Sequence, residues 1–199
     1  MAQNNINTSL SQEVIESALR YERQKESVFK VLKILFNSII VVAACSVLIA
    51  NLVFPVMRVN GTSMEPIMSD GDIITSIKSV KLITRGDIIA FYYNDKVLLK
   101  RVIALPGDTV NIDDEGNVYV NNKAIEEPYI TQKSLGICDV EFPLTVEENT
   151  VFVLGDHRSV SVDSRSQDVG NIHYERIIGK IVFRVYPLTE FGFFDSEKE

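Results

Sequence analysis

The feature that most constrains this chain is an uncharged apolar run, residues 34–57, which lies between Lys33 and Arg58. A helix needs about 20 apolar residues to cross the hydrocarbon core of a membrane, and this run is longer than that. The run therefore predicts one transmembrane helix over 34–57, preceded by a segment over 1–33 and followed by a folded domain over 58–199.

Three other interpretations of the run fit less well. A buried core helix would show a polar face, whereas here polar residues are few and scattered: Asn37, Ser38, Ser46 and Asn51. A cleaved signal would lie near the N-terminus and hold about 7 to 15 apolar residues. The stretch Val42–Cys45 resembles a lipoprotein signal, but the apolar residues continue beyond Cys45. We therefore interpret the run as an uncleaved signal anchor.

Charge predicts the orientation of this anchor. Its N-terminal side is rich in basic residues, whereas only Arg58 lies close on the other side; these basic residues are Arg20, Arg23, Lys25, Lys30 and Lys33. By the positive-inside rule we expect a single-pass protein of the cell membrane, with the N-terminus in the cytoplasm and residues 58–199 on the extracytoplasmic face. The lipid bilayer is then one partner.

The domain beyond the anchor is acidic. Of 20 Lys and Arg, 5 precede residue 58, and of 27 Asp and Glu, 4 do, which leaves 15 basic against 23 acidic residues. This balance argues against a nucleic-acid partner. Cys45 lies in the predicted anchor and Cys138 outside it, so no disulfide is expected between them. His157 and His173 have no clustered ligand pattern, and we expect neither a metal nor a cofactor.

Beyond Arg58 the sequence changes to short runs rich in β-branched and aromatic residues, separated by turn residues. Turn residues make 109–126 consecutive hairpins, whereas 126–149 is expected to be a peripheral excursion. The fold class is therefore mostly β, an antiparallel β-sheet domain preceded by one transmembrane helix. The expected strands are Asp72–Ile77, Asp87–Tyr93, Val97–Leu105, Thr109–Ile112, Asn117–Val120, Thr150–Leu154 and Arg176–Tyr186. A capping box at Ser9 also predicts a helix that runs toward the anchor.

Four motifs follow the anchor in order: Asn60–Pro66 (NGTSMEP), Arg85–Phe91 (RGDIIAF), Lys100–Asp108 (KRVIALPGD) and Gly155–Arg165 (GDHRSVSVDSR). Together they resemble the bacterial type I signal peptidases, over roughly residues 34–187. The resemblance implies a membrane-bound serine endopeptidase. Its substrates would be exported preproteins, cleaved after small residues at sites of the Ala-X-Ala type to remove the N-terminal signal peptide.

Ser63 and Lys100 are the residues on which this chemistry would depend. A serine hydroxyl is a weak nucleophile until a base removes its proton, and lysine can act as that base only when neutral. In a strand, Leu98 and Val102 share a face with Lys100, and apolar neighbours favour the neutral amine. Taken alone, each residue fits an ordinary interpretation better, an exposed lysine on an edge strand and a serine in a turn. The resemblance assigns Ser63 as nucleophile and Lys100 as general base.

The last motif is expected to support the site. By resemblance, Ser161 hydrogen-bonds the Lys100 amine, and Asp163 and Arg165 form an ion pair that holds the loop. The alternative is a solvated turn whose charged residues have no such role.

The chain also departs from the family pattern. His157 stands where the family usually has Asn, Ile67 where Thr is common, and Ala104 where Gly is frequent. Gly61 stands where some relatives carry a hydroxyl that helps to bind the oxyanion. The oxyanion hole is therefore expected to use backbone amides, chiefly that of Ser63.

Other functions remain open at this point. A dedicated processing peptidase for one surface protein or pilin would keep the same fold and residues. A silent membrane-anchored module that only binds peptides would be favoured if Ser63 or Lys100 were missing, and both are present. The self-cleaving repressors share a Ser-Lys mechanism but carry a DNA-binding domain and no membrane span.

Overall fold

The computed structural model describes residue 25 and residues 28–49, 52–79 and 83–194. The chain divides into two units between Ala50 and Asn51. In the first unit an apolar helix runs over Val28–Ile49, 22 residues that are long enough to cross a membrane. Every side chain of this helix is exposed, whereas a core helix would have buried side chains.

The helix differs in its bounds from the predicted anchor at 34–57. Its described part reaches back to Val28, before the predicted start at residue 34, and the last predicted anchor residues instead belong to strand β1 (Val56–Arg58). Pro55 explains the change, because proline lacks the backbone N–H of a continuing helix and disfavours helix in the residue before it. The limits of the membrane segment itself stay a prediction. The helix predicted from Ser9 begins outside the described residues.

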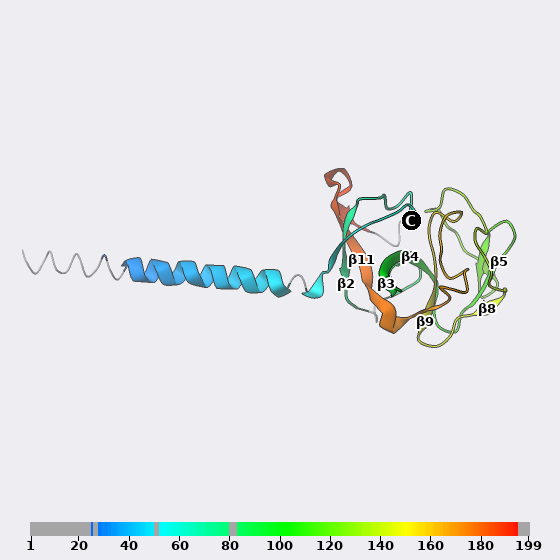
Figure 1. The fold of residues 1–199 in the computed structure, drawn as a ribbon, viewed down its shortest axis with the longest axis horizontal. Coiled ribbons are helices and arrows are strands. Elements are labelled where there is room, and N and C mark those ends of the chain that lie inside the picture. Colours follow the sequence, from blue (N-terminus) through cyan, green and yellow to red (C-terminus); the bar gives the residue numbers. More distant parts are fainter. Residues whose placement is uncertain (1–24, 26–27, 50–51, 80–82, 195–199) are drawn as a thin grey trace, which may run out of the picture. The chain divides into compact units, whose positions relative to one another are not determined.

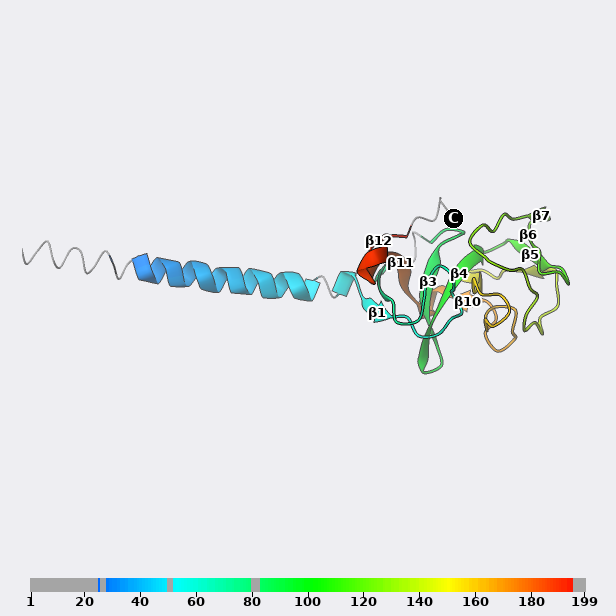
Figure 2. The same cartoon turned by 90° about the horizontal axis from the view of Figure 1, so that it is seen from above.

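Most strands of the second unit form one antiparallel sheet, in the order β1-β2-β11-β3-β4-β9-β10, with β12 paired to β11 (Figures 1 and 2). Each of the seven strands expected from the sequence is present, with bounds within one residue of those predicted. Besides β1, the sheet contains β2 (Ile73–Ile77), β3 (Ile88–Tyr93), β4 (Lys96–Ala104), β9 (Thr150–Leu154), β10 (Ile172–His173), β11 (Ile177–Tyr186) and β12 (Gly192–Phe193).

A second antiparallel sheet has the order β7-β6-β5-β8. The consecutive hairpins predicted over 109–126 are found as β5 paired with β6 and β6 paired with β7. Segment 126–149 is less peripheral than expected, because it supplies β8, which pairs with β5. The strands are β5 (Thr109–Ile112), β6 (Val118–Val120), β7 (Lys123–Ala124) and β8 (Leu144–Thr145); two 3-10 turns, η2 (Tyr174–Arg176) and η3 (Leu188–Glu190), flank β11.

Two apolar clusters position the functional residues. One joins the sheets, since Phe152 and Leu154 of β9 pack with Val110 of β5 and Val118 of β6. The other lies beneath the turn after β1, where Met64 and Met68 pack against residues of β2, β3 and β11. The mostly β, antiparallel fold preceded by one apolar helix is therefore confirmed, and the turn that holds Ser63 is fixed to the centre of the larger sheet.

Candidate active site

Ser63 lies in a tight turn that links β1 to β2. Met64 and Met68 flank the turn with exposed fractions of 1% and 0%, so the core holds it on the side away from solvent. Gly61 has a φ of +97°, a backbone conformation that side chains rarely permit, and its N–H donates to Asp70 Oδ1 at 2.7 Å. These contacts leave Ser63 half-buried.

Lys100 of β4 reaches this hydroxyl from the sheet. Its Nζ lies 2.8 Å from Ser63 Oγ and 2.9 Å from the Leu99 carbonyl oxygen. The lysine is 2% exposed, and burial lowers the pKa of its amine to about 8, against the opposing charges of Asp163 and Asp156. A substantial fraction of the amine is therefore neutral near pH 8, which is the form that can accept a proton.

The loop Gly155–Arg165 closes over the nucleophile from β9. The His157 backbone N–H donates to the Ser63 carbonyl at 3.1 Å. Gly155 makes this approach possible, because a Cβ at that position would lie 2.7 Å from the Ser63 carbonyl oxygen and 2.2 Å from Ser161 Oγ. A residue without a side chain is therefore required where the loop meets the turn.

The bond expected between Ser161 and Lys100 is not formed. Ser161 is fully buried, and its Oγ has no hydrogen-bond partner among the described residues. The Lys100 amine donates to the Leu99 carbonyl and to Ser63 instead. The structure brings Ser161 to the site as a side chain packed against Gly155, rather than as a partner of the amine.

The ion pair expected between Asp163 and Arg165 is present and buried. Arg165 Nε and Nη2 each donate to the Asp163 carboxylate at 2.8 Å, and Asp163 also accepts the Gly155 N–H at 2.9 Å. Arg165 reaches beyond the loop as well, donating to the carbonyls of Ser134 and Leu135. The alternative of a solvated turn does not fit this pair, because both side chains are at most 1% exposed.

Sequence reasoning missed two residues of the support. In segment 126–149, Glu127 pairs with Arg158 of the loop, and the Tyr129 hydroxyl donates to Glu127 at 3.1 Å. The Arg101 guanidinium lies 3.9 Å from the centroid of the Tyr129 ring and holds Asp156 by two hydrogen bonds, at 2.9 and 2.8 Å. Charged residues at Asp156 and Arg158 were visible in the motif, but nothing in the sequence paired them with segment 126–149.

Two hollows adjoin the Ser63 turn. The larger, of about 750 Å³, lies between residues 57–64 and residues 95–99 and includes Ser63 in its wall; we call it the Ser63 cleft. The other, of about 420 Å³, is lined by Glu65 and Pro66 and by the loop residues His157 and Ser159; we call it the Glu65 cavity.

Comparison with known proteins identifies the family of this chain. Residues 31–186 match the family model described as signal peptidase, peptidase S26. Signal peptidase I of Bacillus licheniformis is 34% identical over 84% of this chain and 93% of its own length, and that of Bacillus caldolyticus is 36% identical over 76% and 91%. A signal peptidase I crystal structure from Enterococcus faecalis shares 32% identity over 51% of this chain and 98% of its own, with a TM-score of 0.41. The chain therefore belongs to the type I signal peptidases, which are serine peptidases of family S26.

Proposed function

We propose that this chain cleaves signal peptides from exported preproteins, with Ser63 as nucleophile and Lys100 as general base. One observation carries the proposal: Lys100 is 2% exposed, and its amine lies 2.8 Å from the hydroxyl of a serine in the wall of a cleft. A buried amine of lowered pKa next to a hydroxyl is the pairing that serine activation by lysine requires.

The reaction follows from this contact. Neutral Lys100 Nζ takes the proton from Ser63 Oγ while Oγ attacks the scissile carbonyl carbon, and the carbonyl oxygen gains negative charge. The Lys100 ammonium then gives its proton to the leaving amine nitrogen, and the C–N bond breaks to leave an acyl-enzyme. Lys100, neutral again, takes a proton from water while the water oxygen attacks the acyl carbon. The bond from the acyl carbon to Ser63 Oγ then breaks, and the Lys100 ammonium returns its proton to Oγ.

The developing negative charge needs donors, and we infer that the Ser63 backbone N–H is the first of them. Gly61 has no side chain to contribute, and the hydrogen bonds of the turn within the described chain do not use the Ser63 N–H. Ser161, Asp163 and Arg165 are supporting residues in this proposal. The ion pair fixes the loop, and Ser161 fills the space beside Gly155 and the Ser63 carbonyl.

We infer that the Ser63 cleft receives the substrate residues before the cut. On one side of the cleft lies β1, which pairs with β2 along one edge. On the other side lie residues 96–99 of β4, which pair with β3 but come before the part of β4 that pairs with β9. An extended peptide can pair with backbone at such edges. Apolar walls from Met64, Val97 and Leu99 suit small side chains, as sites of the Ala-X-Ala type require.

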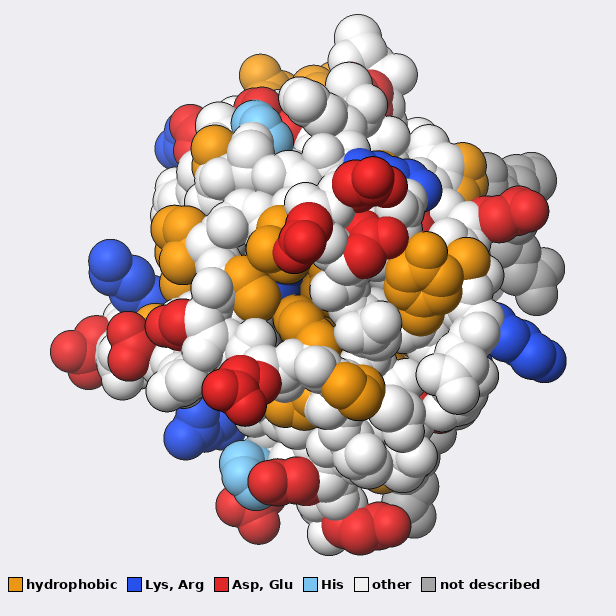
Figure 3. All heavy atoms as spheres, turned by 90° about the vertical axis from the view of Figure 1, so that its right-hand side faces the viewer, with side chains coloured by type: hydrophobic (Ala, Val, Ile, Leu, Met, Phe, Trp, Pro, Cys, Tyr) orange, Lys and Arg blue, Asp and Glu red, His pale blue; other side chains and the backbone are white. Residues whose placement is uncertain are grey.

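We propose that Val28–Ile49 anchors this enzyme in the cell membrane, with the second unit on the extracytoplasmic face. The helix supports anchoring by its length and apolar composition, and the basic residues before it support the orientation. The proposal gives the protein no nucleic-acid partner, since acidic side chains are spread over the face that carries the second sheet (Figure 3).

The test uses the purified full-length chain in detergent and a preprotein with an Ala-X-Ala site. We expect one cut after the second Ala, no cleavage by Ser63→Ala, and normal cleavage by the control Ser79→Ala. The rate at low substrate concentration should rise with pH as the Lys100 amine, of pKa about 8, loses its proton. An intact preprotein with the wild-type chain, or equal cleavage by Ser63→Ala, would contradict the proposal.

A further inference from the structure

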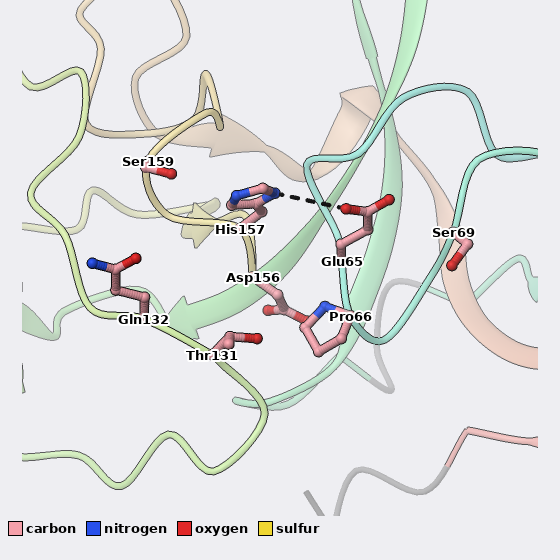
Figure 4. Close-up of a pocket in the computed structure, with 8 residues that line it drawn as sticks. All are labelled: Glu65, Pro66, Ser69, Thr131, Gln132, Asp156, His157 and Ser159. Carbon is pink, nitrogen blue, oxygen red and sulfur yellow. Dashed lines mark ion pairs between the residues drawn. The ribbon is translucent and has the colours of Figure 1, made fainter.

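The Glu65 cavity is a polar hollow beside the nucleophile that the chemistry above does not use (Figure 4). Its volume of about 420 Å³ falls in the range of ligand pockets, about 300–1,000 Å³. Three segments form its wall: the turn after Ser63, segment 126–149 and the loop from β9. Apart from Pro66 its lining side chains are polar or charged, namely Glu65, Ser69, Thr131, Gln132, Asp156, His157 and Ser159.

The cavity begins within reach of the reacting atoms. Glu65 is two residues after Ser63, so their Cα atoms lie at most about 7 Å apart. His157, which lines the cavity, donates its backbone N–H to the Ser63 carbonyl at 3.1 Å. A substrate peptide in extended form advances about 3.3 Å per residue. Only its first or second residue after the bond that Ser63 attacks can therefore place a side chain in this cavity.

Glu65 is the carboxylate in this wall that no hydrogen bond among the described residues holds, and its one ion-pair contact is with His157 (Figure 4). The other one, Asp156, has both oxygens bound by Arg101. Glu65 Oε2 faces His157 Nδ1 at 3.9 Å, and about 39% of the Glu65 side chain is exposed. The His157 Nδ1 atom also lies 3.3 Å from the Thr62 carbonyl oxygen. Within the described residues, the cavity therefore presents a partly exposed carboxylate without a hydrogen bond, next to hydroxyl and amide groups.

The opposite wall is held in place by buried contacts. Thr131 and Gln132 follow Tyr129, whose ring packs against Arg101 and whose hydroxyl binds Glu127. Glu127 in turn pairs with Arg158 of the same loop that carries His157. The cavity is therefore bounded by segments that the buried ion pairs tie together, rather than by a loose surface loop.

We propose that the Glu65 cavity binds the first or second residue after the cleaved bond and favours a lysine or arginine side chain there. The inference rests on the proposed function, in which the apolar Ser63 cleft takes the residues before the cut. The chain after the cut must then leave Ser63 by another route, and the Glu65 cavity is the adjoining hollow. A carboxylate with nearby hydroxyl and amide groups is a site for a cationic side chain.

The experiment compares peptides that share one Ala-X-Ala site and differ only in the residue after the cut, Lys, Gln or Glu at the first or second position. The full-length chain in detergent cleaves them, and kcat/KM is measured for each. At the favoured position we expect kcat/KM of the Lys peptide to exceed that of the Glu peptide by about three- to tenfold. At a partly exposed site, the attraction of Lys and the repulsion of Glu together give a ratio in this range. Glu65→Gln should bring this ratio close to one, and Glu65→Lys should reverse it.

The control is Glu175→Gln, which removes an exposed carboxylate of η2 and should keep the wild-type ratio. Because each ratio is taken within one variant, a general loss of activity does not affect it. A ratio near one in the wild type, or a Lys preference that survives in Glu65→Gln, would overturn the subsite while leaving the proposed function standing. Failure of the wild type to cleave any of the peptides would overturn the proposed function and the subsite with it.

Discussion

Two neighbouring basic residues of β4 have opposite electrostatic roles. Lys100 and Arg101 point to opposite sides of the strand and are 2% and 1% exposed. Arg101 is matched by the Asp156 carboxylate and stays charged, whereas Lys100 has no carboxylate bound to its amine and has a lowered pKa. Arginine suits the first role because it does not lose its proton in proteins, and lysine suits the second because it can.

The lowered pKa of Lys100 predicts a stability effect that is independent of activity. An amine with a pKa of about 8 in the folded state and 10.5 when unfolded makes the unfolded chain bind more protons between those values, so stability rises with pH there. Below pH 8 the full cost of the buried charge applies. Lys100→Met should therefore be more stable than wild type by about 3 kcal/mol near pH 7, and the gap should narrow as pH approaches 10.5.

Chemical denaturation in detergent at several pH values measures this gap. Lys123→Met, at an exposed lysine of β7, is the matched control and should show little change. If the difference in unfolding free energy between Lys100→Met and wild type stayed constant from neutral to alkaline pH, burial would not lower the pKa of the Lys100 amine.

The loop from Gly155 to Arg165 is the element that brings the two halves of the site together. It contacts the Ser63 carbonyl through His157, and it contacts segment 126–149 through Arg158 and Arg165. Its charged side chains are buried in pairs, so removing one partner would leave an uncompensated buried charge. The loop thus sets the position of the nucleophile by contacts that lie outside the reacting groups.

Gly155→Ala tests this element. The added methyl would lie within 3 Å of the Ser63 carbonyl and of Ser161, so one of them must move. We expect a loss of about 1–3 kcal/mol in stability and a fall of at least about tenfold in kcat/KM, since displacements near 1 Å cost that much or more. Gly192→Ala, where a Cβ meets nothing within 4 Å, is the control and should behave like wild type. Unchanged turnover in Gly155→Ala would refute the close approach.

The strands show which features sequence patterns can predict. Runs such as Thr150–Leu154 have enough apolar and β-branched residues to define a strand, whereas β10 and β12 have two residues each and depend on their neighbours. Ser63 and Lys100 were found through motifs, and the structure places them in contact. The roles of Glu127 and Tyr129 were not predictable, because their partners Arg158 and Arg101 are distant in sequence. What gives both residues their roles is burial next to these arginines, which no local sequence pattern indicates.

At the scale of the whole molecule, a row of three apolar residues and one threonine crosses one end of the larger sheet. Val56 of β1 lies opposite Thr75 of β2, Thr75 opposite Phe183 of β11, and Phe183 opposite Phe193 of β12. Val56 is 59% exposed and Phe193 82%, and the β11–β12 connection adds exposed Leu188. Because Val56 follows the apolar helix by only a few residues in the chain, we propose that this row meets the lipid surface.

Fluorescence can test this contact, because the chain contains no tryptophan. Phe193→Trp in the full-length chain, reconstituted in vesicles, should show a blue-shifted emission that lipids with quenching groups on their acyl chains reduce. Tyr119→Trp reports from β6 of the second sheet, at the other end of this unit in Figures 1 and 2, and should not be quenched. Equal quenching of both probes, or of neither, would contradict the proposal.

Segment 126–149 is the longest stretch of mainly irregular chain in the described part of the second unit, and its attachments have a consequence for proteolysis. It is fixed near its start by Glu127, in its middle by the carbonyls of Ser134 and Leu135, and then by Asp139, which binds Gln167 through both its carboxylate and its carbonyl. Proteases preferentially cut exposed loops whose backbone is not held by hydrogen bonds or burial, and these contacts hold the segment at several points along its length. We therefore expect segment 126–149 to resist limited proteolysis as long as its ion pairs and backbone contacts are intact.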